Sequence, residues 1–483
     1  MPTTVRTPKR TPRRRGRRAP TKAKLSPTAL AVDRYIEGVL NGKVIAGQLI
    51  RLAVKRHLLD LQKGKKRGLR FDEQKASDAI EFFSYLKHSK GEWAGQSFTL
   101  EPWQKFIVWV LFGWVKKDGT RRFKTGYLEV PRKNGKSTLG AGIGLKLAFA
   151  DDEPGAEVYS AATKKDQAII VHGEATRMVK ASPDLIDVIQ VYKNSLTRID
   201  KAQKYEPLGA DEDTLDGLNV HAAIVDELHA HKTRGVYDLM ETGTSARRQP
   251  LLFAITTAGT DQTEASICWE QHVYVEQILR GVIEDDTYFG FICNMDEKDD
   301  WQDERNWHKA NPNLGVSKKL DYMRDQALKA KNMPSKLNTF LRLDLNQWTQ
   351  QVTRWIDLGL WDKNAGAPID ESELHGKPCY AGLDLSSVSD LTAFVLLFRD
   401  PASGVASVLC RFWCPEARLS DEHNRYRDQY EAWAREGLIT TTPGNAIDYE
   451  AVKAQVLKDA STFQIQELAV DRLFQGYQMS MQL

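Results

Sequence analysis

One short segment, residues 129–138, constrains this 483-residue chain more than any other. It has the sequence Glu-Val-Pro-Arg-Lys-Asn-Gly-Lys-Ser-Thr, and its Gly-Lys-Ser lies where an expected strand gives way to a helix. Backbone N–H groups at a helix N-terminus attract anions, Lys136 can reach β- and γ-phosphates, and the Ser137 hydroxyl can ligate Mg²⁺. The usual pattern has a glycine five residues before Gly135, where this chain has Val130. The segment therefore predicts a phosphate-binding loop with one irregularity.

Two apolar runs further along the chain end in side chains suited to phosphoryl transfer. Residues 220–225 stop at Asp226 and Glu227, and residues 251–256 lead into Thr257. Their lengths and flanks are typical of buried parallel strands. Asp226 is suited to hold the Mg²⁺ shell, Glu227 to orient or deprotonate water, and Thr257 to sense a γ-phosphate. Because ligands of open α/β sheets bind beyond the carboxyl ends of strands, we expect one nucleotide site.

Gln104 is a candidate for recognition of the nucleotide base. It lies on an expected helix upstream of the phosphate-binding loop. Its amide can both donate to and accept from the N6/N7 edge of adenine, which would select ATP. An isolated Gln would be unremarkable, so this interpretation rests on its placement.

Composition indicates a protein of two or three domains without a membrane span. Hydrophobic residues make up 41% of the chain, enough for sizeable cores. The longest apolar run, residues 106–114, is shorter than the roughly 18 residues that a span needs, so we expect a buried helix there. Five cysteines without the spacing of a zinc site favour reduced thiols in the cytosol.

Basic residues are concentrated at the start of the chain. Ten of the 68 Lys and Arg residues lie within residues 1–24, which contain no Asp or Glu. Such a segment, rich in Pro and Thr, cannot bury a core, so we predict a disordered tail over residues 1–25. The tail is suited to bind nucleic-acid phosphates. A solvated tail without a partner, or a segment that only resembles a transit peptide, are the alternatives.

The character of the chain changes after the nucleotide-binding region. Residues 356–378 are rich in Gly and Pro and predict a connector between a domain at 26–355 and a second domain at 379–483. In the second domain, a strand carrying Asp384 precedes an expected antiparallel meander, and a later strand ends at Asp471. If the two aspartates converge, they could bind Mg²⁺ or Mn²⁺ ions about 4 Å apart, which cleave phosphodiesters by in-line displacement.

An ordered set of segments resembles the large terminase subunit of tailed bacteriophages. The segments are residues 131–137, 223–227, 256–259, 310–315 and 382–386. The resemblance implies an α/β fold, with a P-loop ATPase domain around a mostly parallel sheet followed by an RNase H-like nuclease domain. It also accounts for Val130, because loops of this family commonly lack the first glycine.

The resemblance implies roles for the matching residues. Lys136 and Ser137 would bind phosphate and Mg²⁺, Asp226 would be the Walker B acid, and Glu227 the catalytic carboxylate. Arg132 or Lys133 would sense the γ-phosphate, and residues 256–259 would couple hydrolysis to movement. The candidate nucleotide-binding residues are Gln104, Arg132, Lys133, Asn134, Gly135, Lys136, Ser137, Thr138, Asp226 and Thr257. The candidate nuclease residues, which would bind Mg²⁺ or Mn²⁺, are Asp384 and Asp471.

The nuclease domain departs from the family pattern. Such a site normally has a third carboxylate on a later strand or helix, but the sequence ends at Leu483, soon after Asp471. Asp390 is expected in a turn and is a poor replacement. We therefore expect a C-terminally truncated domain and weak or no cleavage.

These features together predict an ATPase that moves double-stranded DNA into viral procapsids and cuts concatemers. The resemblance implies a small terminase subunit and the portal as partners, a ring of about five copies on the portal, and no membrane. It places the protein in the host cytoplasm and transiently on the procapsid, not in the mature virion. A different translocating ATPase or helicase, and an inactive DNA-binding remnant of a defective prophage, are the alternatives.

Overall fold

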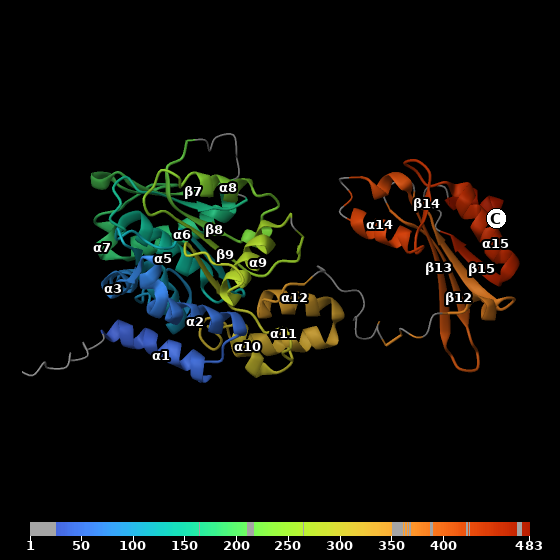
Figure 1. The fold of residues 1–483 in the computed structure, drawn as a ribbon, viewed down its shortest axis with the longest axis horizontal. Coiled ribbons are helices and arrows are strands. Elements are labelled where there is room, and N and C mark those ends of the chain that lie inside the picture. The colour runs from blue at the N-terminus through green and yellow to red at the C-terminus, as the bar shows by residue number, and fades with distance from the viewer. Residues whose placement is uncertain are drawn as a thin grey trace, which may run out of the picture. The chain divides into compact units, whose positions relative to one another are not determined.

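The computed structural model describes residues 26–163, 165–209, 217–263, 265–349, 361, 363–364, 366, 369–386, 390–421, 424, 426–470 and 476–483. The predicted basic tail and Asp471 lie outside these ranges. The chain forms two compact units, Met1–Asp357 and Leu358–Leu483, and Figure 1 labels many of their elements.

The first unit is built on an eight-stranded sheet. The strands are β3 (Thr125–Glu129), β4 (Glu157–Ala161), β5 (Gln190–Val191), β6 (Leu196–Arg198), β7 (Gln203–Leu208), β8 (Val220–Asp226), β9 (Leu251–Thr256) and β10 (Tyr288–Ile292), in the order β10-β3-β9-β8-β4-β7-β6-β5. The pairs from β10 to β7 are parallel, and β6 and β5 are added antiparallel. Every residue of β8, β9 and β10 is buried, as expected for parallel strands covered on both faces.

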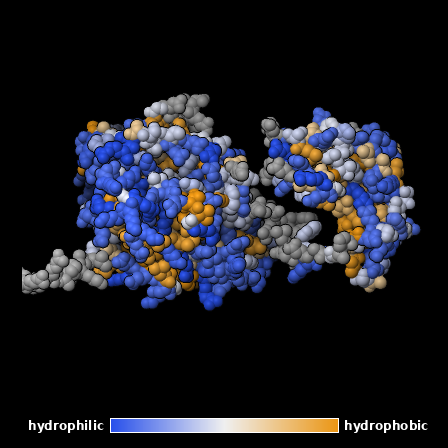
Figure 2. Space-filling view, in the orientation of Figure 1, coloured by the Kyte–Doolittle hydropathy of each residue, from blue (hydrophilic) through white to orange (hydrophobic). Residues whose placement is uncertain are grey.

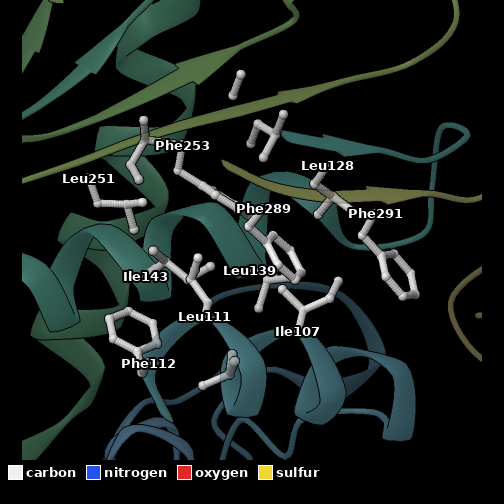
Figure 3. Packing of buried hydrophobic residues seen from close by; sticks show 14 of the residues in the cluster. Ile107, Leu111, Phe112, Leu128, Leu139, Ile143, Leu251, Phe253, Phe289 and Phe291 are labelled. Atoms are coloured by element: carbon white, nitrogen blue, oxygen red, sulfur yellow. The ribbon is translucent and has the colours of Figure 1, made fainter. Parts of the chain in front are cut away.

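Helices and a separate two-stranded antiparallel sheet, formed by β1 and β2, complete the first unit. They are α1 (Pro27–Asn41), α2 (Gln48–Lys63), β1 (Leu69–Phe71), α3 (Glu73–Phe82), α4 (Pro102–Gly113), β2 (Trp114–Lys116), α5 (Lys136–Phe149), α6 (Lys165–Ala181), α7 (Pro183–Ile186), α8 (Gly235–Thr242), α9 (Ile267–Arg280), α10 (Glu304–Ala310), α11 (Leu320–Asn332) and α12 (Pro334–Leu345). Figure 3 shows Leu139 and Ile143 of α5 near Ile107 of α4 and Phe253 of β9, in the main core. This apolar packing fixes α5, and with it the phosphate-binding loop, against the sheet.

The second unit has a five-stranded sheet in the order β14-β13-β12-β11-β15. Its elements are β11 (Pro378–Asp384), β12 (Thr392–Arg399), β13 (Ala406–Pro415), α14 (Arg427–Arg435), β14 (Thr440–Thr442), α15 (Tyr449–Thr462), β15 (Gln464–Val470) and α16 (Gly476–Gln482). Strands β11, β12 and β13 form the predicted antiparallel meander, whereas β14 and β15 pair parallel to its two outer strands. The predicted α/β class and the mostly parallel first sheet are confirmed, and the sheet of the second unit is mixed.

None of the described helices is long and apolar enough to cross a membrane. The face seen in Figure 2 is mostly hydrophilic, with smaller apolar patches between the polar areas.

Candidate active site

The phosphate-binding loop runs from the end of β3 to the start of α5. Lys133 and Gly135 both have left-handed backbone conformations, with φ of 68° and 82°. Gly adopts this conformation readily, whereas Lys rarely does. Val130, at the position where glycine was expected, is fully buried, and its N–H donates to the carbonyl of Thr256 at 3.0 Å. Val130 directly follows β3 and does not have a positive φ, so a side chain that packs in the core replaces glycine there without backbone strain.

Four side chains predicted to form the chemical centre meet beyond the ends of β3 and β8. The Nζ atom of Lys136 lies 2.7 Å from Oε1 of Glu227. Ser137 donates a hydrogen bond from Oγ to Oδ2 of Asp226 at 3.3 Å. The phosphate-binding loop and the acidic end of β8 therefore form one site.

Glu227 is held in a strained backbone conformation. Its φ is 51°, and its N–H donates to Oδ1 of Asp226 at 2.8 Å. Its Oε2 is buried and has no hydrogen-bond partner among the described residues. Backbone strain of this kind clusters at functional sites, where the surroundings fix the side chain. The arrangement suits a carboxylate that must present an oxygen to water.

Burial and neighbouring charges move the pKa values of the two acids in opposite directions. Burial, with the charge of Glu227, raises the pKa of Asp226 to about 6, against the opposing effect of Lys136. Burial also disfavours ionised Glu227, but the charge and hydrogen bond of Lys136 outweigh it, so the pKa of Glu227 is lowered. Carboxylates with separated pKa values are typical of sites in which the acids have different roles.

The raised pKa of Asp226 makes ATP hydrolysis sensitive to mild acid. Protonated Asp226 is a poor Mg²⁺ ligand, so we expect the hydrolysis rate to fall as the pH drops through about 6. Since Mg²⁺ favours the ionised acid, the midpoint should move to lower pH as the Mg²⁺ concentration rises. Initial rates measured between pH 5 and 8 at two Mg²⁺ concentrations test this, and a midpoint that does not respond to Mg²⁺ would contradict it.

The raised pKa of Asp226 also makes the stability of the metal-free protein depend on pH. Because the pKa of Asp226 is raised above its ordinary value of 3.8, the folded state binds the extra proton, and stability falls as pH rises from about 4 to about 6. Asp226→Asn should therefore raise the free energy of unfolding by about 2 to 3 kcal/mol at pH 8, with little gain near pH 4. Thermal melting of both proteins in EDTA measures the difference, and an equal gain at both pH values would contradict the assignment.

His229 joins this centre to the end of β9. Its N–H donates to Oγ1 of Thr256 at 3.0 Å, and its Nδ1 lies 3.4 Å from Oγ1 of Thr257 and 3.2 Å from Oε2 of Glu227. Burial lowers the pKa of His229 to about 4, so the ring is neutral at physiological pH. The predicted coupling segment therefore contacts His229, which in turn lies against Glu227. His229 was not predicted from the sequence, although it follows the acidic pair by two residues.

A buried asparagine ties the coupling segment to neighbouring strands. Asn346, just after α12, accepts from the N–H of Ala258 at 2.7 Å through Oδ1. Its Nδ2 donates to Oε1 of Glu129 at 3.1 Å and to the carbonyl of Cys293 at 2.9 Å. Glu129 is fully buried and also contacts His272 at 2.8 Å. This network, which the sequence analysis did not predict, joins the ends of β3, β9 and β10.

A cavity of about 390 Å³ opens beside the start of α5. Its lining includes Gln104, Gly135 and Thr138 from the predicted set, together with Trp93 and Phe98. The Oε1 atom of Gln104 accepts from the N–H of Glu101 at 3.0 Å, which caps α4 and fixes the amide near the cavity. The aromatic residues were missed because they precede any recognisable motif. A cavity of this size with aromatic and amide walls suits a nucleoside.

The two candidate γ-phosphate sensors are alike in exposure but differ in their electrostatic effect on the centre. Arg132 and Lys133 are both exposed. Among the described residues, neither forms a salt bridge with a carboxylate. The charge of Arg132 contributes to the lowered pKa values of Glu227 and His229, which places it electrostatically within the centre.

These features fit a Mg²⁺-bound triphosphate. The N-terminus of α5 and Lys136 supply positive charge, and the hydroxyl of Ser137 and the carboxylate of Asp226 supply oxygen ligands of the kind that Mg²⁺ prefers. Oε2 of Glu227 is buried and accepts no hydrogen bond in the described chain, although Nδ1 of His229 lies 3.2 Å from it.

Fewer of the predicted nuclease residues can be placed. Asp384 is exposed at the end of β11, and Leu383 beside it pairs with Val470, the last residue of β15. Asp471 lies outside the described residues, and Asp390 is exposed next to the start of β12. Within the described ranges, no group of three or more His, Cys, Asp or Glu side chains is arranged to hold a metal ion. A two-aspartate metal site stays a prediction.

Comparison with protein families gives matches over both units. The model described as "Terminase large subunit, ATPase domain" matches residues 102–277, and "Terminase large subunit, endonuclease domain" matches residues 282–478. The second match begins before β10, although β10 pairs with β3 in the first sheet.

Individual relatives include two proteins and one solved structure. The large terminase subunit of Enterobacteria phage HK97 is 32% identical over 393 residues, which cover 79% of this chain and 74% of that protein. Protein YmfN of Escherichia coli strain K12 is 34% identical over 244 residues, which cover 49% of this chain and 53% of that protein. The crystal structure of the HK97 bacteriophage large terminase has a TM-score of 0.49 at 28% identity, covering 85% of this chain and 82% of that chain.

Proposed function

The chain belongs to the terminase large subunit family, whose members combine an ATPase and an endonuclease domain, and from this premise we propose that it hydrolyses ATP to drive double-stranded viral DNA into procapsids. The observation that carries the proposal is the meeting of Lys136 with Glu227 at 2.7 Å and of Ser137 with Asp226 at 3.3 Å. A phosphate-binding cation, oxygen ligands for a metal and a base for water are together what ATP hydrolysis requires.

In the proposed mechanism, each residue has one task. Mg²⁺, held by Ser137 and Asp226, would offset the negative charge that the phosphates carry. Lys136 would leave Glu227 for the β- and γ-phosphates, and Glu227 would then orient and deprotonate the attacking water. Arg132 is the preferred γ-phosphate sensor of the two candidates, since its charge acts on Glu227. Loss of the γ-phosphate would be transmitted through His229 to the coupling segment.

We assign base selection to Gln104. In Gln104→Glu the carboxylate still accepts the Glu101 N–H and caps α4, but it cannot donate to N7 of adenine. We expect KM for ATP to rise about tenfold, the effect of one lost hydrogen bond in a desolvated pocket, and the preference for ATP over GTP to shrink. Steady-state kinetics with both nucleotides measure this change. Equal losses for ATP and GTP would contradict a role in base selection.

For the nuclease domain we propose that Asp384 and Asp471 are metal ligands. Impaired cleavage also stays a prediction, although the endonuclease family match extends to residue 478, beyond Asp471. Nicking of a supercoiled plasmid in the presence of Mn²⁺ tests both the ligand assignment and the predicted impairment. Rapid nicking that Asp384→Ala abolishes would contradict the impairment and support Asp384 as a ligand.

The proposed partners are double-stranded DNA, a small terminase subunit and the portal, on which about five copies would form a ring. The proposed location is the host cytoplasm and, transiently, the procapsid. DNA-stimulated ATP hydrolysis by the purified chain tests the function. A defective remnant would show no turnover, and unwinding of a forked duplex would instead indicate a helicase.

A further inference from the structure

A distant segment, residues 311–317, stabilises the unfavourable backbone of the phosphate-binding loop. Lys133 has a φ of 68°, in a region that a residue with a side chain seldom adopts. Such a conformation persists only where surrounding contacts hold it. Segment 311–317, with the sequence Asn-Pro-Asn-Leu-Gly-Val-Ser, supplies contacts of this kind.

Asn134 is the centre of these contacts and is fully buried. Its Nδ2 donates to Oδ1 of Asn311 at 2.9 Å, and its Oδ1 accepts from the N–H of Asn313 at 3.1 Å. The carbonyl of Asn134 accepts from Nδ2 of Asn313 at 3.2 Å, and the carbonyl of Lys133 accepts from Oγ of Ser317 at 2.7 Å. Both the side chain and the backbone of the loop are therefore bound from one segment.

Segment 311–317 is itself anchored in the core of the first unit. Asn311 donates from Nδ2 to the carbonyl of Asp344 at 2.7 Å, and Oδ1 of Asn313 accepts from Nε1 of Trp103 at 2.6 Å. Lys318 forms a buried ion pair with Asp344 at 2.8 Å. Since these groups are buried, water cannot easily replace a lost partner, so the contacts fix the position of both asparagines.

The same segment lines the candidate nucleoside cavity. Asn313, Val316 and Ser317 form part of its wall, beside Gln104 and Gly135. Two residues that hold the loop therefore also border the space in which we place the base. A nucleotide in this cavity would therefore contact the phosphate-binding loop and also the residues that are hydrogen-bonded to that loop.

We propose that Asn311 and Asn313 are positioning residues that hold the phosphate-binding loop in its nucleotide-binding conformation, an inference that rests on the proposed ATPase function. They act through Asn134 rather than on the reacting atoms. A loop that is already ordered does not have to be ordered when the phosphates bind, so the benefit appears in nucleotide affinity.

The first test is the affinity of the full chain for a non-hydrolysable ATP analogue with Mg²⁺. Asn311→Ala and Asn313→Ala should each weaken binding about 10- to 100-fold, because each leaves buried hydrogen-bonding groups without partners. In kinetic assays, KM should rise more than kcat falls, since Glu227 is untouched. Asn338→Ala is the matched control: Asn338 is a buried residue of α12 whose side-chain N and O atoms have no hydrogen-bond partner in the described chain. Its affinity should stay within about twofold of the wild type.

A double-mutant cycle separates positioning of the loop from a general structural role. If Asn311 acts through Asn134, the Asn134→Ala/Asn311→Ala double variant should bind the analogue about as weakly as Asn134→Ala alone. Fully additive losses would mean that Asn311 acts through α10 and α12 instead, and would overturn the proposal.

Ser317→Ala keeps the test decisive if Asn311→Ala does not fold. It removes a partly exposed hydroxyl that donates to the carbonyl of Lys133 and accepts from Nδ2 of Asn313 at 3.1 Å, so the fold should persist and affinity should fall about threefold to tenfold. Wild-type affinity in Ser317→Ala and in every folded asparagine variant would overturn the proposal. If the wild-type chain itself binds no analogue, the ATPase function fails, whereas a functional wild type with unaffected variants refutes only the positioning role.

Discussion

A Glu227→Gln variant is expected to lose ATP turnover by about 10²- to 10⁴-fold in kcat, the range associated with loss of a positioned general base. Gln has nearly the same size as Glu but cannot take a proton from water. It also weakens the 2.7 Å contact with Lys136 from an ion pair to a neutral hydrogen bond, which frees Lys136 for the phosphates. We therefore expect the variant to bind ATP at least as tightly as the wild type.

Turnover and binding must be measured separately to test this role. We would determine kcat in the presence of linear double-stranded DNA and the affinity for ATP under conditions without turnover. Glu73→Gln, at an exposed position of α3, is the matched control and should behave as the wild type. Unchanged kcat in Glu227→Gln would remove Glu227 from the chemistry, and a loss of ATP binding would indicate a structural role.

The second large effect is expected from Lys136→Ala, which should weaken nucleotide binding about a hundredfold and abolish measurable turnover. Lys136 is mostly buried, and charged hydrogen bonds in such positions contribute about 1.5 to 3 kcal/mol. Its removal also leaves Asp226 and Glu227 without their nearest cation. Because the charge of Lys136 lowers the pKa values of both acids, these values should rise in the variant.

This rise in pKa distinguishes Lys136→Ala from a simple loss of folding. Any residual nucleotide or Mg²⁺ binding should need a higher pH than in the wild type, while the circular dichroism spectrum stays unchanged. Lys55→Ala, at an exposed position of α2, serves as the control for loss of a surface charge. Wild-type affinity for ATP in Lys136→Ala would refute the assignment of the phosphate-binding loop.

The chemical centre could be predicted from the sequence because its signals are local. Each of Lys136, Ser137, Asp226 and Glu227 lies at the end of a strand or the start of a helix whose apolar pattern is visible in the sequence. Parallel pairing then brings those ends to one edge, and the contacts of 2.7 Å between Lys136 and Glu227 and of 3.3 Å between Ser137 and Asp226 agree with that expectation. Val130 departs from the motif, but the buried strand explains it.

The contacts that support this centre could not be predicted in the same way. Asn311 meets Asn134 across 177 residues, and Asn346 meets Glu129 across 217. Single polar residues at such separations carry no periodicity and no motif chemistry. The segment containing Asn311 was noted for its family resemblance, but its contact with the loop depends on the packing of α10 and α12.

The order of strands in the second unit also depends in part on contacts between segments that are far apart in the sequence. The meander from β11 to β13 was predictable, because its strands are consecutive and each pairs with the next. The parallel pairing of β15 with β11 joins strands separated by the whole unit, so the sequence alone does not specify it. The neighbourhood of Asp384 therefore depends on long-range packing rather than on a local motif.

The central claim is that Lys136 and the Asp226–Glu227 pair surround one Mg²⁺-bound triphosphate. A structure of the full chain, determined with Mg²⁺ and a non-hydrolysable ATP analogue, tests it most directly. We predict that Lys136 leaves Glu227 for the β- and γ-phosphates, that Mg²⁺ contacts Ser137, and that a water lies between Glu227 and the γ-phosphate. An analogue bound elsewhere, with the 2.7 Å contact between Lys136 and Glu227 intact, would contradict the account.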